Sequence, residues 1–155
     1  MSLLGVDLGL KTGLALFAEN GRLVWYRSHN YGTTARLKRG IPGLIREIEG
    51  LQRIVVEGGG GLAEIWEKEA GKRHFAFQRI SADQWRRLFL LPRKQKSGLE
   101  AKRFAETSAR KVILWSNLPK PTALRHDTAE AILTGLWGVL DCGWLESLPS
   151  ELRPK

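Results

Sequence analysis

The stretch SLLGVDLGLKTGLALFAENGRLVWYR, residues 2–27, carries the strongest signals for the fold. Apolar residues dominate Ser2–Leu8 and point alternately to two faces, which predicts a buried β-strand. A short turn leads to a second predicted strand, Thr12–Phe17. Asn20-Gly21 is a strong hairpin signal because both residues tolerate positive φ, and Arg22–Arg27 follows as a third strand. The sequence therefore predicts a three-stranded antiparallel meander.

The rest of the chain alternates between strand and helix signals. Arg53–Glu57 is a short β-branched strand, and His74–Ile80 is a further predicted strand. Pro42 favours the first turn of a helix, and Ser81 and Ser97 begin capping-box patterns. The sequence thus predicts an α/β fold, a mixed five-stranded sheet flanked by helices. The helices are expected over residues 42–50, 62–69, 81–90, 97–111 and 127–140.

The composition indicates one folded domain with a polyanionic partner. The domain is expected over residues 1–148, followed by a short C-terminal tail over 149–155. The 25 Lys and Arg against 16 Asp and Glu give a net charge of +9, which favours nucleic acid or an anionic membrane as partner. Because Cys142 is the only cysteine, an internal disulfide and a cysteine-rich zinc site are excluded. With no basic region near the apolar start and no apolar run of ~18–20 residues, we expect a cytoplasmic protein.

Four acidic residues lie at unusual positions for acids. Asp7 and Glu57 each come at the end of a hydrophobic strand. If these strands pair in parallel, both carboxylates emerge at the carboxyl edge of the sheet, where α/β folds bind ligands. Asp127 and Glu130 share one face of the last predicted helix and border its apolar stripe. Clustered carboxylates repel unless a cation joins them, and their hard oxygens suit two Mg²⁺ or Mn²⁺ ions about 4 Å apart.

Each acid also has a purely structural interpretation. Asp7 could be a turn or cap residue, and Glu57 could be a solvated strand end beside Gly58–Gly61. Asp127 could be an N-terminal acid that the helix dipole favours. The glycine run is no P-loop because no Gly-Lys-Ser/Thr follows; we expect a flexible turn that lets DNA approach the backbone. From spacing alone, metal binding and these structural roles stay open.

Three motifs resemble those of the RuvC-type Holliday junction resolvases, within the RNase H-like superfamily. GVDLG at 5–9, followed by TGLA at 12–15, looks like the first-strand motif of that family. IVVE at 54–57 is similar to the second motif. HDTAEAIL at 126–133 resembles the C-terminal helix of the phage and chloroplast branch, as does SADQW at 81–85. The motifs cover nearly the whole chain in the expected order.

The resemblance implies an RNase H-like nuclease with Asp7, Glu57, Asp127 and Glu130 as catalytic metal ligands. It also implies Mg²⁺ or Mn²⁺ and a homodimer that cuts a four-way DNA junction symmetrically, leaving ligatable nicks. Glu130 departs from the second aspartate of many bacterial members, and the neighbouring His126 could take part instead.

A second departure concerns how the junction centre is opened. Gly60 stands where bacterial members carry an aromatic wedge, so the wedge is absent or supplied elsewhere, for example by Trp66. Trp66 and Trp85 could stack on unpaired bases, but a place in the hydrophobic core is the favoured interpretation.

Positive charge concentrates between residues 79 and 111. Ten basic residues and three acids in this segment give +7 of the net charge. A charged run is usually a solvated face, but this one adjoins the predicted acidic pocket, and such residues contact phosphates. Lys102 also matches the catalytic-side lysine of the family and could stabilise charge on the phosphate. The predicted DNA-binding residues are Arg86, Arg87, Arg93, Lys94, Lys96, Lys102 and Arg103, with a weaker patch at Arg36, Lys38 and Arg39.

The sequence as a whole favours a metal-dependent endonuclease for branched DNA. An RNase H-like nuclease acting on RNA shares the first motif, but the additional acidic-arginine motif of that group is not found. A non-catalytic basic nucleic-acid-binding module would explain the charge without chemistry. A nucleotide-binding domain of the actin type shares the first strand and hairpin, but it needs a second domain that 155 residues do not accommodate.

Overall fold

A five-stranded mixed sheet forms the centre of the molecule, whose computed structural model describes residues 1–89 and 98–154. The strands run in the order β3-β2-β1-β4-β5, with β1, β2 and β3 antiparallel and β4 and β5 parallel to β1. The predicted meander and mixed sheet are therefore confirmed. The strands are β1 (Ser2–Asp7), β2 (Lys11–Ala18), β3 (Leu23–Asn30), β4 (Leu51–Glu57) and β5 (Ala76–Ile80).

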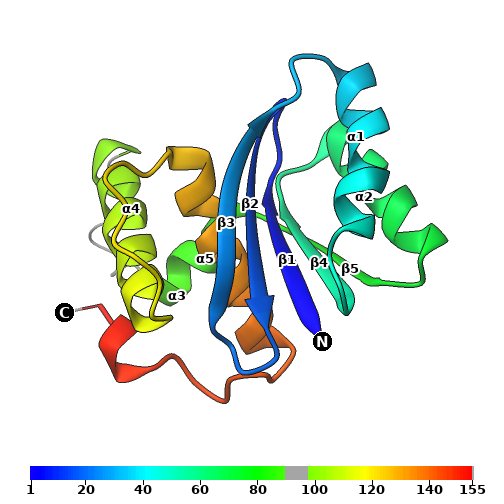
Figure 1. Cartoon of the computed structure of the whole chain (residues 1–155). Coiled ribbons are helices and arrows are strands. Elements are labelled where there is room, and N and C mark those ends of the chain that lie inside the picture. The colour runs from blue at the N-terminus through cyan, green and yellow to red at the C-terminus, as the bar shows by residue number, and fades with distance from the viewer. Residues whose placement is uncertain (90–97, 155) are drawn as a thin grey trace.

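Helices cover both faces of the sheet (Figure 1). Successive strand residues point to opposite faces, so Leu3 packs with α3, α4 and α5 while Leu4 packs with α1 and α2. Two hydrophobic cores result, one on each side of the sheet. The helices are α1 (Thr34–Arg46), α2 (Gly60–Lys72), α3 (Ala82–Phe89), α4 (Gly98–Trp115) and α5 (His126–Asp141).

Helix α5 lies directly against the strands because the residues between them are small. A Cβ atom added at Gly5 of β1 would come 2.6 Å from the backbone oxygen of Ala131. A Cβ at Gly13 of β2 would clash with the backbone of Asp127. Both glycines are therefore needed for close approach, and the first half of α5 is held over the ends of β1 and β2.

Helix α1 corrects the prediction of a helix over 42–50. The helix begins at Thr34 because the Thr33 hydroxyl accepts a hydrogen bond from the backbone N–H of Arg36 at 3.2 Å. Pro42 lies inside the helix. The buried side chains of Leu37, Ile41 and Ile45 recur at four-residue spacing, and this stripe rather than Pro42 was the signal for the helix.

The glycine run and the end of the chain are more ordered than expected. Gly60 and Gly61 form the first turn of α2, so only Gly58 and Gly59 remain in the turn after β4. Within residues 149–155, Ser150–Leu152 forms a short 3₁₀ helix, and Leu152 is buried in the core beside α4. None of the helices in the described ranges has the length and apolar character needed to cross a membrane.

Candidate metal centre

Two carboxylates of the site come from neighbouring parallel strands. Asp7 is the last residue of β1, and Glu57 is the last residue of β4. The two residues are direct partners in the register of the parallel pair. Because side chains of paired residues point to the same face, both carboxylates reach the α5 side of the same sheet edge.

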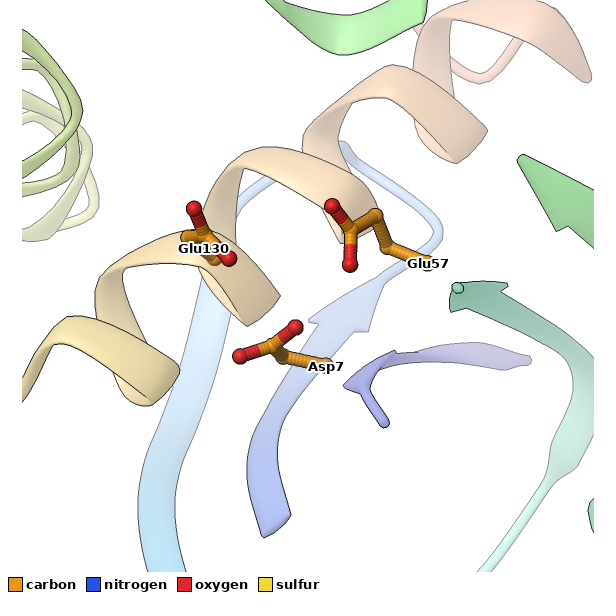
Figure 2. Close-up of side chains that lie close together, drawn as sticks. All are labelled: Asp7, Glu57 and Glu130. Carbon is orange, nitrogen blue, oxygen red and sulfur yellow. The ribbon is translucent and has the colours of Figure 1, made fainter. Parts of the chain in front are cut away.

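The third carboxylate, Glu130, comes from the start of α5. The close approach of α5 at Gly5 places Glu130 above the strand ends, where its side chain is 11% exposed. Asp7, Glu57 and Glu130 point toward one another in Figure 2, and each offers an oxygen within 4.8 Å of the others. We call these three residues the acidic cluster.

Burial and mutual repulsion raise the pKa values in the acidic cluster. Desolvation is the largest cause of the rise in the pKa of Asp7 to about 9, followed by repulsion from Glu130 and the interactions with Glu57. Desolvation also raises the pKa of Glu57, although the hydrogen bond from Asp7 opposes the rise. Without a cation, the cluster therefore holds a proton between Asp7 and Glu57 at neutral pH. A divalent cation would displace that proton and neutralise the carboxylates.

Two basic side chains lie on the Glu130 side of the cluster. His126 Nε2 lies 3.0 Å from Glu130 Oε1, one helical turn away on α5. Arg86 Nη2, from α3, lies 3.8 Å from the same oxygen. Attraction to Arg86 and His126 lowers the pKa of Glu57, but the rise that burial causes is larger. These two contacts orient the Glu130 carboxylate, which stays directed toward the strand ends.

No protein-family model matches the sequence, and no curated protein matches it significantly. T. thermophilus RuvC in complex with a Holliday junction substrate superposes with a TM-score of 0.64 at 14% identity, covering 96% of this chain and 99% of RuvC. Fowlpox virus resolvase in complex with Holliday junction DNA gives a TM-score of 0.62 at 18% identity, covering 92% and 99%. This chain has a RuvC-like fold.

The RuvC-like fold confirms the fold class predicted from the three motifs. Its β1 and β4 end in the first two motif acids, and α5 carries the third motif. The likeness extends over nearly the full length of both solved proteins. The phage and chloroplast branch stays a prediction.

Asp127, the fourth predicted ligand, lies beside the cluster and not in it. Its Oδ2 accepts a hydrogen bond from the Ser28 hydroxyl of β3 at 2.8 Å. Its Oδ1 accepts from the backbone N–H of Thr128 at 2.6 Å. Repulsion from Asp127 still contributes to the raised pKa of Asp7. The RuvC-like fold therefore brings three predicted ligands together and leaves the fourth close enough to interact electrostatically.

The predicted DNA-binding residues are only partly described. Lys102 and Arg103 are exposed on α4, and Arg87 is exposed on α3. Among the described residues, the ion pairs with the acidic cluster come from Arg86 and His126, and the catalytic role of Lys102 stays a prediction. The weaker patch lies on α1, across the sheet from the cluster. Arg93, Lys94 and Lys96 lie outside the described residues.

Two tryptophans occupy the hydrophobic cores. Trp66 of α2 and Trp85 of α3 are both 0% exposed, so neither stacks on an unpaired base. The favoured interpretation of both as core residues is confirmed. The suggestion that Trp66 supplies the missing wedge is wrong, because its ring is packed between α2 and the sheet.

Ser28 acts through a tertiary contact, whereas His126 acts through a local contact within α5. Ser28 is 99 residues from Asp127 in sequence, and no local motif marks the pair. The contact between His126 and Glu130 has a sequence signal, because residues four apart on a helix are neighbours. Chemically, the assembled site is an anionic oxygen cage that suits a hard divalent cation.

Proposed function

We propose that the protein is a metal-dependent endonuclease that resolves four-way DNA junctions. The observation that carries this proposal is the acidic cluster of Asp7, Glu57 and Glu130 at one edge of a RuvC-like sheet. Both solved proteins with this fold were determined in complex with Holliday junction DNA. The net charge of +9 on the present chain suits the same polyanionic class of substrate.

The acidic cluster would hold Mg²⁺ or Mn²⁺. The donor set fits such an ion because three carboxyl groups converge, each with an oxygen within 4.8 Å of the others. When bound, the divalent ions supply an activated water and neutralise charge on the leaving oxygen of the phosphodiester. We propose two ions for each site, with Asp127 released from Ser28 as the fourth ligand.

Other residues would hold and orient the DNA. Arg87, Lys102 and Arg103 are exposed on the helices that flank the cluster side of the sheet, and they would bind backbone phosphates. Arg86 and His126 would keep Glu130 in position as the phosphate enters. His126, which is 41% exposed at its side chain, could also pass a proton to or from solvent.

A homodimer would match the symmetry of the substrate. A four-way junction has two equivalent strands to cut, and a two-fold dimer presents two equivalent sites. This part of the proposal rests on the substrate and would be tested by sedimentation of the protein alone and with junction.

A cleavage assay on synthetic substrates tests the function. With Mg²⁺ we expect paired nicks in a four-way junction, and with a chelator we expect no product but retained binding. Asp7→Asn should bind the junction and not cut it, because the cluster loses a ligand for the cation. Asp141→Asn is the matched control, since Asp141 is exposed at the far end of α5.

Three outcomes would overturn the proposal. Equal or faster cleavage of RNA or an RNA–DNA hybrid would favour the RNA nuclease. Salt-sensitive binding with no Mg²⁺-dependent product would favour a non-catalytic module. Full activity in Asp7→Asn would show that the acidic cluster is not the reacting site.

A further inference from the structure

A polar pocket lies at the end of the meander, next to the acidic cluster. Lys11, Ser28, Asn30 and Arg125 line it, and its volume is about 210 Å³. Lys11 and Asn30 are partners in the register of β2 and β3, and Arg125 immediately precedes α5. Residues that are far apart in sequence are thus brought together by the pairing of these strands and by the close approach of α5 at Gly13.

The pocket presents hydrogen-bond donors and positive charge. Lys11 and Arg125 are both exposed and carry two permanent charges between them. The Asn30 Oδ1 accepts a hydrogen bond from the backbone N–H of Gly32 at 3.0 Å, which leaves the amide nitrogen of Asn30 as the donor of that side chain. Helix α5 begins directly after Arg125, and the N-terminus of a helix carries a partial positive charge. No acidic residue appears among the described residues that line the pocket.

Ser28 forms the wall between the pocket and the candidate metal centre. Its hydroxyl donates to Asp127 Oδ2 at 2.8 Å, so the same side chain lines the pocket and contacts the acid beside the cluster. An anion in the pocket would therefore be separated by the Ser28 side chain from Asp127, the acid beside the cluster.

We propose that this pocket binds a backbone phosphate of the DNA strand that reaches the candidate metal centre. A phosphate has several acceptor oxygens and matches converging Lys, Arg and amide donors. The assignment rests on the proposed function for the presence of DNA at the cluster. It adds a contact that orients the strand along the end of β3, where Ser28 and Asn30 lie.

A second pocket provides an internal comparison. It lies between α1 and α2, on the opposite face of the sheet, and is lined by Lys38, Lys68 and Lys72. Glu64 and Glu69 also line it, so its positive charge is partly compensated. Removing two lysines there changes the net charge by the same amount as removing Lys11 and Arg125, without touching the proposed phosphate site.

The experiment compares two double variants in junction binding. Lys11→Ala with Arg125→Ala is measured against Lys68→Ala with Lys72→Ala, using a labelled four-way junction in chelator at several salt concentrations. We expect the first variant to raise Kd about tenfold and to reduce the slope of log Kd against log salt by about 1–2. The α2 variant should change Kd less than about threefold and should leave the slope unchanged.

A second arm separates backbone phosphate from free phosphate. NMR titration with inorganic phosphate should shift the backbone amides of Ser28 and Asn30 only at millimolar concentrations, and the Lys11→Ala, Arg125→Ala variant should lose the shift. Saturation at micromolar phosphate, with junction binding unaffected by the variant, would indicate a free-anion site and overturn the proposal.

The proposal is also overturned if the Lys11→Ala, Arg125→Ala variant keeps the wild-type Kd and salt slope, or if the α2 variant loses as much affinity. Neither readout depends on cleavage. A wild-type protein that binds the junction without cutting it would contradict the proposed function, while selective loss of affinity in the Lys11→Ala, Arg125→Ala variant would still support the pocket.

Discussion

The two faces of the sheet pack by different means. On the α1 and α2 face, large side chains such as Leu4, Ile41 and Trp66 fill the space between the layers. On the α5 face, Gly5 and Gly13 let the helix backbone approach the strands directly. All three residues of the acidic cluster lie on the side of the sheet that α5 covers. We call the α1 and α2 side the large-residue face. The α5 face buries large side chains such as Phe17 as well, but the close approach at Gly5 and Gly13 determines where Glu130 lies.

Because of this difference, adding or removing one side-chain carbon atom should affect the packing of the two faces unequally. Side chains can adjust around a change on the large-residue face, because rotamers can shift. On the α5 face, an added carbon would meet backbone atoms, which cannot move without displacing the whole helix. Substitutions on each face therefore test whether the position of α5 controls the site.

The largest effect is expected from Gly5→Ala. The added Cβ would lie 2.6 Å from the backbone oxygen of Ala131, so α5 must shift away from β1. We expect the free energy of unfolding to fall by about 3 kcal/mol, as for an overpacked core, and Mn²⁺ affinity to fall more than about tenfold. Urea unfolding and calorimetric titration measure the two effects.

Gly61→Ala is the matched control for that substitution. Nothing lies within 4 Å of a Cβ added at Gly61, which is in the first turn of α2. We expect a stability change within about 1 kcal/mol, because alanine is the better helix former, and unchanged Mn²⁺ affinity. Wild-type stability and metal binding in Gly5→Ala would contradict the importance of close approach.

The next largest effect is a dependence of the free energy of unfolding of the metal-free protein on pH. Burial raises the pKa of Asp7 from 3.8 to about 9, so the folded protein binds more protons than the unfolded chain between these values. The free energy of unfolding should therefore fall as pH rises from 5 to 9, by about 1–3 kcal/mol for a buried group that becomes charged without a partner. Urea unfolding in chelator at several pH values measures it.

Asp7→Asn should remove most of this pH dependence and make the metal-free protein more stable at pH 9. A smaller slope should persist because the pKa of Glu57 is also raised. Asp141→Asn, at the exposed end of α5, should behave as wild type. A stability that rises between pH 5 and 9 in the wild type would contradict the electrostatics of the cluster.

The smallest effect is expected from Ile41→Val on the large-residue face. Ile41 is fully buried between α1 and the sheet, and it lies across the sheet from the acidic cluster. The loss of one methylene should lower the free energy of unfolding by about 1 kcal/mol and leave Mn²⁺ affinity within about threefold. A tenfold loss of affinity, measured by the same calorimetry, would show that this face also controls the site.

The sequence predicted the strands well and the first helix poorly, for identifiable reasons. The alternation in residues 2–27 and the β-branched run before Glu57 are local signals, and all five predicted strands are present. The last strand begins at Ala76 and not at His74, because His74 has a positive φ of 59°. Pro42 suggested a helix start, but the cap at Thr33 and the buried stripe from Leu37 placed the start at Thr34. Proline is compatible with a helix start but does not define one.

The candidate site was predictable as far as strand pairing determines it. Parallel pairing of β1 and β4 brings Asp7 beside Glu57, as expected from their positions at strand ends. The separation of Asp127 from the cluster could not be predicted, because it depends on Ser28, a residue of a different strand 99 positions away. The pocket at Lys11 and Arg125 likewise depends on how α5 meets the end of the meander.

The most direct test of the metal centre is anomalous diffraction from crystals of the protein soaked in Mn²⁺. We expect a strong manganese peak within coordination distance of Asp7, Glu57 and Glu130, and no peak there in Asp7→Asn. A saturating soak that leaves the acidic cluster of the wild-type protein without a manganese peak would contradict this expectation.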